Sequence, residues 1–375
     1  MTSWIWRARS TPRSWRWSVL ALCGAMIAAP LADGMAQVAC PLPAKEKADL
    51  FKNPFNRTSA HHRPIGSGAV YAADDHPATR NWLRSDHLNL NVGNPSGTSV
   101  LEVSPVNPWI VVSGAANCDR IVGMPVTIRL PARGFITNNT RPDGGCADNE
   151  VVIFDRGLPG VNDGTVHQLR QYNWNGGRPV AQRHDTWNIR GRGHETVPGR
   201  RLGPAASGVA GLFGVLRGHE INTPGYPIAH ALHIGVPRKA GTGCNVMLGR
   251  VAVLPATTMD SSYNSPGYNT GKIPYGALLA IKPNVNLNNL GLTEYGLRLA
   301  RAAQNYGMYV LNGGGCDAPA IDADQHVSFD VKWQLRSDIR KIYPHLRMVL
   351  NNDVLGSPVT GGGTPRAANC AFDAT

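Results

Sequence analysis

The chain has 375 residues, of which 42% are hydrophobic and 17% are charged, and its formal net charge is +12. This length can bury a sizeable core, and the low charge content excludes a disordered polyelectrolyte. The 42 glycines and 28 prolines argue against a helical bundle, because both residues break helices, and favour a β-rich chain with many loops.

The first 36 residues are typical of a secretory signal peptide. Four arginines between residues 7 and 16 precede an apolar run over 19–30, and small residues before Gln37 provide a cleavage site after Ala36. The apolar run is short for a membrane-spanning helix, which needs about 20 residues. We therefore expect a secreted protein with no membrane partner after cleavage.

Residues 37–97 are predicted to form an extended N-terminal segment. From residue 98 onward, short runs of alternating or continuous apolar residues predict β-strands. The expected strands cover 98–105, 109–112, 125–131, 150–154, 166–174, 228–236, 251–255, 275–281, 308–311 and 346–350. The stretch 203–220 has helical spacing, but its glycines favour a short helix or irregular turns.

Two helices are expected near 294–306 and 329–342. Thr293 and Ser328 precede them as N-caps, and Gly307 follows the first as a C-terminal cap. Many strands with few helices predict a mainly β fold, with residues 98–375 forming a single jelly-roll-like β-sandwich domain and the two helices inserted. An α+β arrangement is the alternative.

Six cysteines follow the expected cleavage site, and an even number in an exported chain indicates disulfides. We single out the pair Cys118–Cys146, because these cysteines bracket a polar, glycine-rich segment. No cysteines form a C-x-x-C motif, which disfavours zinc-ribbon and thioredoxin sites. The cysteines are Cys40, Cys118, Cys146, Cys244, Cys316 and Cys370.

The strand at 166–174 is the most suggestive stretch for ligand binding. Alternation would place Gln168, Arg170, Tyr172 and Trp174 on one face. Such a face suits sugars, since aromatic rings stack on them while Arg and Gln bind hydroxyls or carboxylates. The alternative is an ordinary core strand whose aromatic rings are buried, with Arg170 at the rim.

A second cluster begins with Arg217-Gly-His219-Glu220 and continues to His230 and His233. On the predicted strand, His230 faces the interior, where it is either a satisfied core histidine or a pocket residue able to act as a base near neutral pH. Glu220 or Arg217 would orient His230 or bind an acidic substrate. His230 and His233 share a face only on a helix, so we expect no zinc site.

Asp322, Asp324 and His326 alternate ahead of the second helix. They would either bind a cation or simply stabilise the N-terminus of that helix, which carries a partial positive charge. The sequence contains no P-loop, no dinucleotide fingerprint, no H-E-x-x-H and no G-x-S-x-G motif. We therefore expect no cofactor and no resident metal.

Three segments carry a resemblance. They are the run from Ile228 to Arg238, the run Ile273-Pro-Tyr-Gly-Ala-Leu-Leu279 and the run Tyr306-Gly-Met-Tyr-Val310. Together they resemble a group of uncharacterised secreted bacterial proteins that share His-Ala-Leu, Ile-Pro-x-Gly and Tyr-Gly segments in this order. The similarity covers about residues 205–315. It implies a secreted, β-rich protein and no particular activity or catalytic residue.

The export signal, the excess of arginine and the strand at 166–174 together predict a carbohydrate-active protein. A polysaccharide lyase acting on an acidic polymer would use His230 as base, Tyr172 as acid and Arg170 or Arg217 to neutralise the carboxylate. A glycosidase would instead need two opposed carboxylates, for which Glu220 and Asp155 are the candidates.

The alternative is an extracellular glycan-binding or structural protein without catalysis. Basic residues suit a polysaccharide or another anionic extracellular ligand, although a generally basic surface would also explain them. The sequence has no dense basic run interleaved with aromatic residues, the pattern typical of nucleic-acid binding, so we expect no nucleic-acid partner. We expect a monomer.

Overall fold

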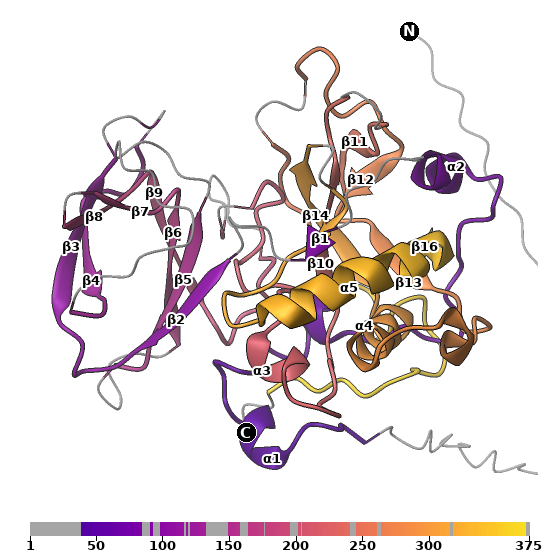
Figure 1. The fold of residues 1–375 in the computed structure, drawn as a ribbon, viewed down its shortest axis with the longest axis horizontal. Coiled ribbons are helices and arrows are strands. Elements are labelled where there is room, and N and C mark those ends of the chain that lie inside the picture. The colour runs from indigo at the N-terminus through magenta and orange to yellow at the C-terminus, as the bar shows by residue number, and fades with distance from the viewer. Residues whose placement is uncertain are drawn as a thin grey trace, which may run out of the picture. The chain divides into compact units, whose positions relative to one another are not determined.

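The computed structural model describes residues 39–84, 91–92, 98–115, 118, 121–132, 149–157, 164–175, 177–195, 202–203, 205–240, 245–260, 264–315 and 318–372. By its internal contacts the chain divides after Ala36, and residues 37–375 form one unit. The fold of this second unit is described below and drawn in Figure 1.

The largest sheet has six strands in the order β1-β15-β10-β14-β13-β16. Its centre is the parallel pair β10 and β14, whose register shifts between Ile234 and Gly235, while β13 runs antiparallel to both β14 and β16. The strands are β1 (Asn91–Val92), β10 (Leu232–Pro237), β13 (Leu278–Ile281), β14 (Met308–Gly314), β15 (Ala320–Ile321) and β16 (Leu346–Met348).

Both faces of this sheet are buried, as expected for a central sheet whose strands are continuous apolar runs. On one face, Leu232, Ile234 and Val310 join a cluster that contains Leu299 and Leu335 from two helices. On the other face, alternate residues of the same strands, such as Tyr309 and Leu311, pack against Phe55, Phe213 and Trp187. Strand alternation therefore divides the core into two layers.

The two helices of the first layer are α4 (Glu294–Asn305) and α5 (Phe329–Ile342). The side chains of Thr293 and Ser328 cap them by accepting hydrogen bonds from the amides of Gly296 and Val331. Gly307 follows α4 with a φ of 83°, a conformation that favours glycine. Both helices and their caps confirm the sequence prediction, and α5 crosses in front of the six-stranded sheet in Figure 1.

Two four-stranded sheets enclose a third core cluster. Their orders are β2-β5-β6-β9 and β4-β3-β8-β7. Val103, Ile153 and Leu169 of the first sheet meet Val112 and Ile128 of the second. The strands are β2 (Ser99–Val103), β3 (Trp109–Gly114), β4 (Val126–Arg129), β5 (Glu150–Asp155), β6 (Thr165–Arg170), β7 (Asn173–Asn175), β8 (Arg178–Ala181) and β9 (Arg183–Asn188).

The structure therefore confirms a β-rich chain with several mixed sheets and a few helices. It does not confirm the jelly-roll topology, since each four-stranded sheet contains a parallel pair, β2 with β5 and β3 with β8. The remaining two-stranded sheet pairs β11 (Leu248–Ala252) with β12 (Ile273–Tyr275).

The segment 37–97 differs from the extended segment that the sequence predicts. It contains α1 (Ala44–Lys47), α2 (Pro77–Leu83), β1 and a short 3₁₀ turn at Ala60–His62. Phe55, Ala60 and Ile65 are fully buried in the second core layer. The segment is thus part of the core, because its few apolar residues fill the space behind β10 and β14.

Candidate functional site

The predicted strand at 166–174 is interrupted at Gln171. This residue has a φ of 50°, which ends β6 at Arg170 and restarts the chain as β7 at Asn173. The interruption breaks the alternation, so the four predicted ligand-binding residues do not form one continuous face. Tyr172 is fully buried in the third core cluster, whereas Arg170 and Trp174 are half-buried.

Gln168 lies in the interior as a structural residue. Its Oε1 accepts hydrogen bonds from Trp187 Nε1 at 2.9 Å and from the Gly211 amide at 3.1 Å. These bonds join β6 and β9 to the loop at Gly211. Gln168 is 0% exposed, so it is not placed to contact a sugar hydroxyl.

The Asp155 carboxylate also makes structural contacts inside the fold. Its two carboxylate oxygens accept hydrogen bonds from Arg129 Nη1 at 2.9 and 3.0 Å, and the Gly157 amide donates to Oδ1. The side chains of Arg129 and Asp155 are 12% and 4% exposed. This buried ion pair joins the two four-stranded sheets, so Asp155 has a structural role.

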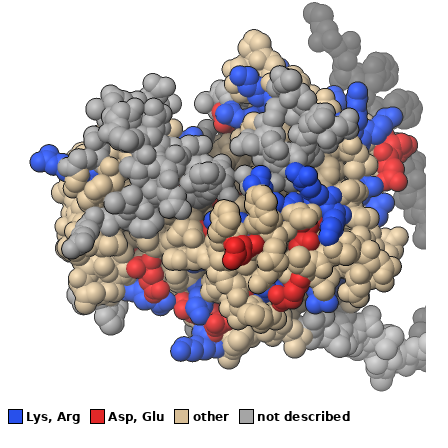
Figure 2. Space-filling model, in the orientation of Figure 1, with Lys and Arg blue, Asp and Glu red and all other residues tan. Residues whose placement is uncertain are grey.

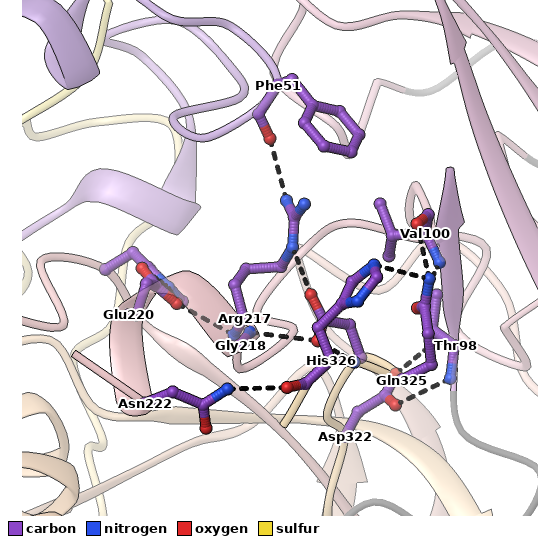
Figure 3. Close-up of polar contacts among 12 residues, drawn as sticks. Phe51, Thr98, Val100, Arg217, Gly218, Glu220, Asn222, Asp322, Gln325 and His326 are labelled. Atoms are coloured by element: carbon purple, nitrogen blue, oxygen red, sulfur yellow. Dashed lines mark hydrogen bonds and ion pairs between the residues drawn. The ribbon is translucent and has the colours of Figure 1, made fainter. Parts of the chain in front are cut away.

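The two motifs predicted separately, Arg217–Glu220 and Asp322–His326, meet in one cluster. A parallel bridge pairs Leu216 with Ala323 just before α3 (Gly218–Ile221). Arg217 Nε donates to Asp324 Oδ2 at 2.9 Å, and the Gly218 amide donates to Asp324 Oδ1 at 3.0 Å. Figure 3 shows Arg217 and Gly218 facing the loop that carries Asp322 and His326.

The Arg217 guanidinium is held by contacts inside the fold. Besides the bond to Asp324, Nη1 donates to the Phe51 carbonyl at 2.9 Å, and the guanidinium lies 4.8 Å from the centre of the Phe51 ring. The Arg217 and Asp324 side chains are 5% and 2% exposed. Arg217 is therefore a buried structural cation rather than a free fork for a substrate carboxylate.

Glu220 and His230 form a second buried pair in the same cluster. His230 Nε2 lies 2.9 and 3.1 Å from the two carboxylate oxygens of Glu220, and His230 Nδ1 lies 2.8 Å from the Ala231 carbonyl oxygen. The Arg217 amide donates to Glu220 Oε2 at 3.0 Å. With Glu220 ionised, both ring nitrogens face an oxygen that can only accept, so His230 carries a hydrogen on each and is an imidazolium.

The electrostatics agree with this charge state. Burial by itself lowers the pKa of His230, but the attraction of Glu220 and the hydrogen bond to it raise that pKa above its ordinary value. Burial raises the pKa of Glu220, yet the charge of His230 brings it below its ordinary value. In this state His230 has no lone pair for a substrate proton, which favours the alternative of a satisfied interior histidine.

His61 completes the cluster and was missed as a site residue from the sequence. Its ring stacks on His230 with centroids 4.3 Å apart, and its Nδ1 accepts a hydrogen bond from the Gly214 amide at 3.1 Å. Burial lowers the pKa of His61 well below its ordinary value, and the charge of His230 lowers it further. The adjacent histidines at 61–62 were the only signal, because no periodic pattern covers that stretch.

The outer edge of the cluster is polar. Asp322 Oδ2 accepts from the Thr98 hydroxyl at 3.0 Å and lies 3.3 Å from His233 Nδ1, while His326 is exposed. Within the described residues, no group of three or more His, Cys, Asp or Glu side chains is arranged to hold a metal ion. The bonds of Asp322 and Asp324 instead anchor the loop that precedes α5.

A cavity of about 390 Å³ lies beside this cluster. Such a volume falls within the usual range of small-ligand pockets. Ile228 and Ala229, which directly precede His230, form one wall, and residues spaced three or four apart on α4 form another. The α4 wall consists of Glu294, Leu297, Arg298, Arg301, Ala302 and Asn305.

The two ends of the described chain close the cavity. Cys40 and Cys370 form a disulfide; Pro41, which follows Cys40, and Ala368, two residues before Cys370, line the cavity. Cys118 is also disulfide-bonded, but its predicted partner Cys146 lies outside the described residues. The Cys40–Cys370 disulfide thus shapes the cavity as well as linking distant parts of the sequence.

Three arginines line the cavity in different ways. Arg298 is a buried scaffold, since it donates to the carbonyls of α3 and the following turn and pairs with Glu294 at 2.9 Å. Arg366 is held by bonds to Tyr71 and Gln304. Arg301 is exposed, and no described residue gives it a hydrogen bond or an ion pair. The cavity therefore combines an apolar floor with a basic rim.

Comparisons of the chain with protein-family models, with curated proteins and with solved structures give no match. None of the described helices has the length and apolar character needed to cross a membrane.

Proposed function

We propose that the protein is secreted and binds an acidic carbohydrate outside the cell, with the cavity beside α4 as its binding site. The basic rim of this cavity is the observation that carries the proposal. Arg301 is available to a ligand, and Arg366 is already oriented by Tyr71. Arginine forks bind carboxylates in a bidentate manner, and an apolar floor suits the face of a sugar ring.

Binding without catalysis is the favoured form of this proposal. A glycosidase needs two carboxyl groups about 5–10 Å apart, whereas Glu294 is the one carboxylate among the described residues that line the cavity, and it pairs with Arg298. A lyase needs a base, and the described lining contains no histidine. Tyr226, which does line it, has a pKa raised mainly by burial and is a poor base.

Secretion rests on the signal-peptide pattern of residues 1–36, and the Cys40–Cys370 disulfide is the kind of bond that persists in oxidising compartments. On this proposal the two four-stranded sheets form a β-sandwich with a supporting role. The protein acts as a monomer and needs no cofactor.

The test is calorimetric titration of the exported protein, disulfide intact, with a digalacturonate and with a neutral disaccharide. We expect binding of the uronate alone, weakening with salt, and a loss of about tenfold in affinity for Arg301→Gln. Arg80→Gln, an exposed change on α2, is the matched control and should leave affinity unchanged.

The same samples are assayed for new reducing ends and for unsaturated products. Turnover of a uronate polymer would contradict the proposal of binding without catalysis and would show that the protein is a lyase or a glycosidase. Equal binding of the neutral sugar, or full affinity in Arg301→Gln, would remove the cavity from the proposal.

A further inference from the structure

The helix α5 presents two large aromatic side chains to solvent. Phe329 is 77% exposed and Trp333 is 63% exposed, although both residue types are normally buried. They are four residues apart, so they lie on the same face of the helix. The opposite face, formed by Val331, Leu335 and Ile339, is buried in the first core layer. The aromatic pair is therefore not needed to attach α5 to the sheet.

The two exposed rings, here called the platform, have nearly parallel planes. Their centroids are 6.5 Å apart and their planes differ by 18°. Flat exposed aromatic surfaces match the apolar face of a sugar ring and, at low conformational cost, provide large contact areas. Two neighbouring exposed rings provide aromatic contact area for a sugar chain.

Basic side chains continue the same helix face beyond Trp333. The guanidinium of Arg336 lies 5.7 Å from the centre of the Trp333 ring, and Arg340 is exposed one turn further along. Asp330 is the exposed carboxylate at the start of α5, whereas Asp338 is fully buried and bonded to Thr293. The charge beside the platform is thus predominantly positive and complements a carboxylate-bearing ligand.

Charge alone does not distinguish this surface from the rest of the described protein surface. On the face shown in Figure 2, basic and acidic groups are interspersed rather than separated into areas of one sign. Trp109 is also 60% exposed, but the cation over its ring, Arg129 at 4.5 Å, pairs with Asp155 and is not available to a ligand carboxylate. The pair on α5 combines two neighbouring exposed rings with adjacent cations.

The platform and the cavity are attached to the same short helix. Asn222, which ends α3, donates to the His326 carbonyl and accepts from the Ser328 amide at the start of α5, as Figure 3 shows for Asn222 and His326. Arg298, in the cavity wall, donates to the carbonyls of Glu220 and Ile221. The two surfaces therefore flank α3.

We propose that Phe329 and Trp333 form a second subsite that stacks sugar units of an acidic polysaccharide whose terminal unit occupies the cavity. This inference rests on the proposed function and extends it from a single sugar to a polymer. Arg336 and Arg340 bind carboxylates of the stacked units.

The test measures the binding affinities of digalacturonate and of a long oligogalacturonate by calorimetric titration. The proteins compared are the parent and the variants Phe329→Ala, Trp333→Ala and Leu355→Ala. The last is the matched control, because Leu355 is a 62% exposed apolar residue outside α5. We expect the long chain to bind more tightly than the short one to the parent. Each aromatic variant should lose roughly 5- to 10-fold in affinity for the long chain and nothing for the short one.

Each other outcome has a defined meaning. If the parent binds both probes and Trp333→Ala retains full affinity for the long chain, the second subsite is rejected, while the cavity remains the proposed binding site. If the parent binds neither probe, the proposed function and the platform fall together. If Trp333→Ala instead lowers the molecular mass measured by light scattering, the platform is a contact between copies of this chain and the proposal is overturned.

Discussion

The imidazole rings of His61 and His230 stack at a centroid distance of 4.3 Å with an interplanar angle of 14°. They differ in charge, because His230 donates from both nitrogens whereas His61 accepts a hydrogen bond at Nδ1. A cationic and a neutral ring can stack closely, whereas two buried imidazolium rings would repel each other. Glu220 therefore determines the charge of the pair, since it is the counterion of His230.

Replacing Glu220 by Gln is expected to lower the free energy of unfolding by about 3–5 kcal/mol, because it leaves a buried imidazolium without its counterion. It should also lower the pKa of His230, which is followed by NMR of the ring carbons. Glu46→Gln removes a half-exposed ion pair with Lys52 and serves as the control, with an expected cost below about 1 kcal/mol. Equal losses in the two variants would contradict a charged His230.

Acid is expected to destabilise the fold through histidines that are buried in the neutral form. Burial lowers the pKa of His62, His184 and His194 from 6.5 to about 4. As the pH falls from 6.5 towards 4, the unfolded chain binds protons that the folded chain does not, so stability decreases. For His62 alone, this difference corresponds to roughly 3 kcal/mol.

His230 acts in the opposite direction. Its pKa is raised, so its contribution is complete below pH 6.5 and is lost as the pH rises through the folded value. Urea unfolding between about pH 7 and pH 4 should show stability falling with acid, and His62→Gln should reduce that slope. An unchanged slope in His62→Gln would show that His62 titrates normally in the folded state.

Local signals in the sequence predicted α4, α5 and their caps, because Thr293, Ser328 and Gly307 act on their immediate neighbours. The same reasoning failed at 166–174, where the positive φ of Gln171 turns the chain between two sheets and puts Tyr172 in the core. No pattern in the strand itself encodes that turn. Alternation along a strand predicts faces only as long as the strand continues.

The candidate site was predictable in part. Arg217, Glu220 and His230 were recognised as a cluster, and the structure brings them together. Their mutual bonds, and those of Arg217 to Asp324 and Phe51, depend on contacts between distant segments. His61 and the cavity were missed for the same reason, since both arise where the N-terminal segment and the C-terminal residues pack against the six-stranded sheet.

Gly218 is expected to tolerate no side chain. A Cβ at this position would lie 2.5 Å from His326 Cβ and 2.6 Å from the His326 carbonyl carbon. Since backbone atoms cannot move away cheaply, Gly218→Ala should separate α3 from the Asp324 loop and cost about 1–3 kcal/mol.

Gly235 provides the matched control for this substitution. A Cβ there would meet its nearest neighbours at an ordinary 3.7 Å, so Gly235→Ala should change stability little. Thermal unfolding of the two variants gives the comparison. A Gly218→Ala protein as stable as Gly235→Ala would mean that α3 and the Asp324 loop are not in tight contact.

The Cys40–Cys370 disulfide should contribute to stability and to ligand binding together. It joins residues separated by 330 positions, so it restricts the unfolded chain strongly, and its removal is expected to cost about 2–5 kcal/mol. Pro41 and Ala368, one and two residues from the bonded cysteines, line the cavity, so the loss should also loosen the cavity wall. The double variant Cys40→Ser/Cys370→Ser is compared with the parent by urea unfolding and by uronate titration. Lower stability with unchanged affinity would show that the chain ends hold the cavity wall without the disulfide. Unchanged stability would show that the disulfide constrains neither the folded nor the unfolded chain.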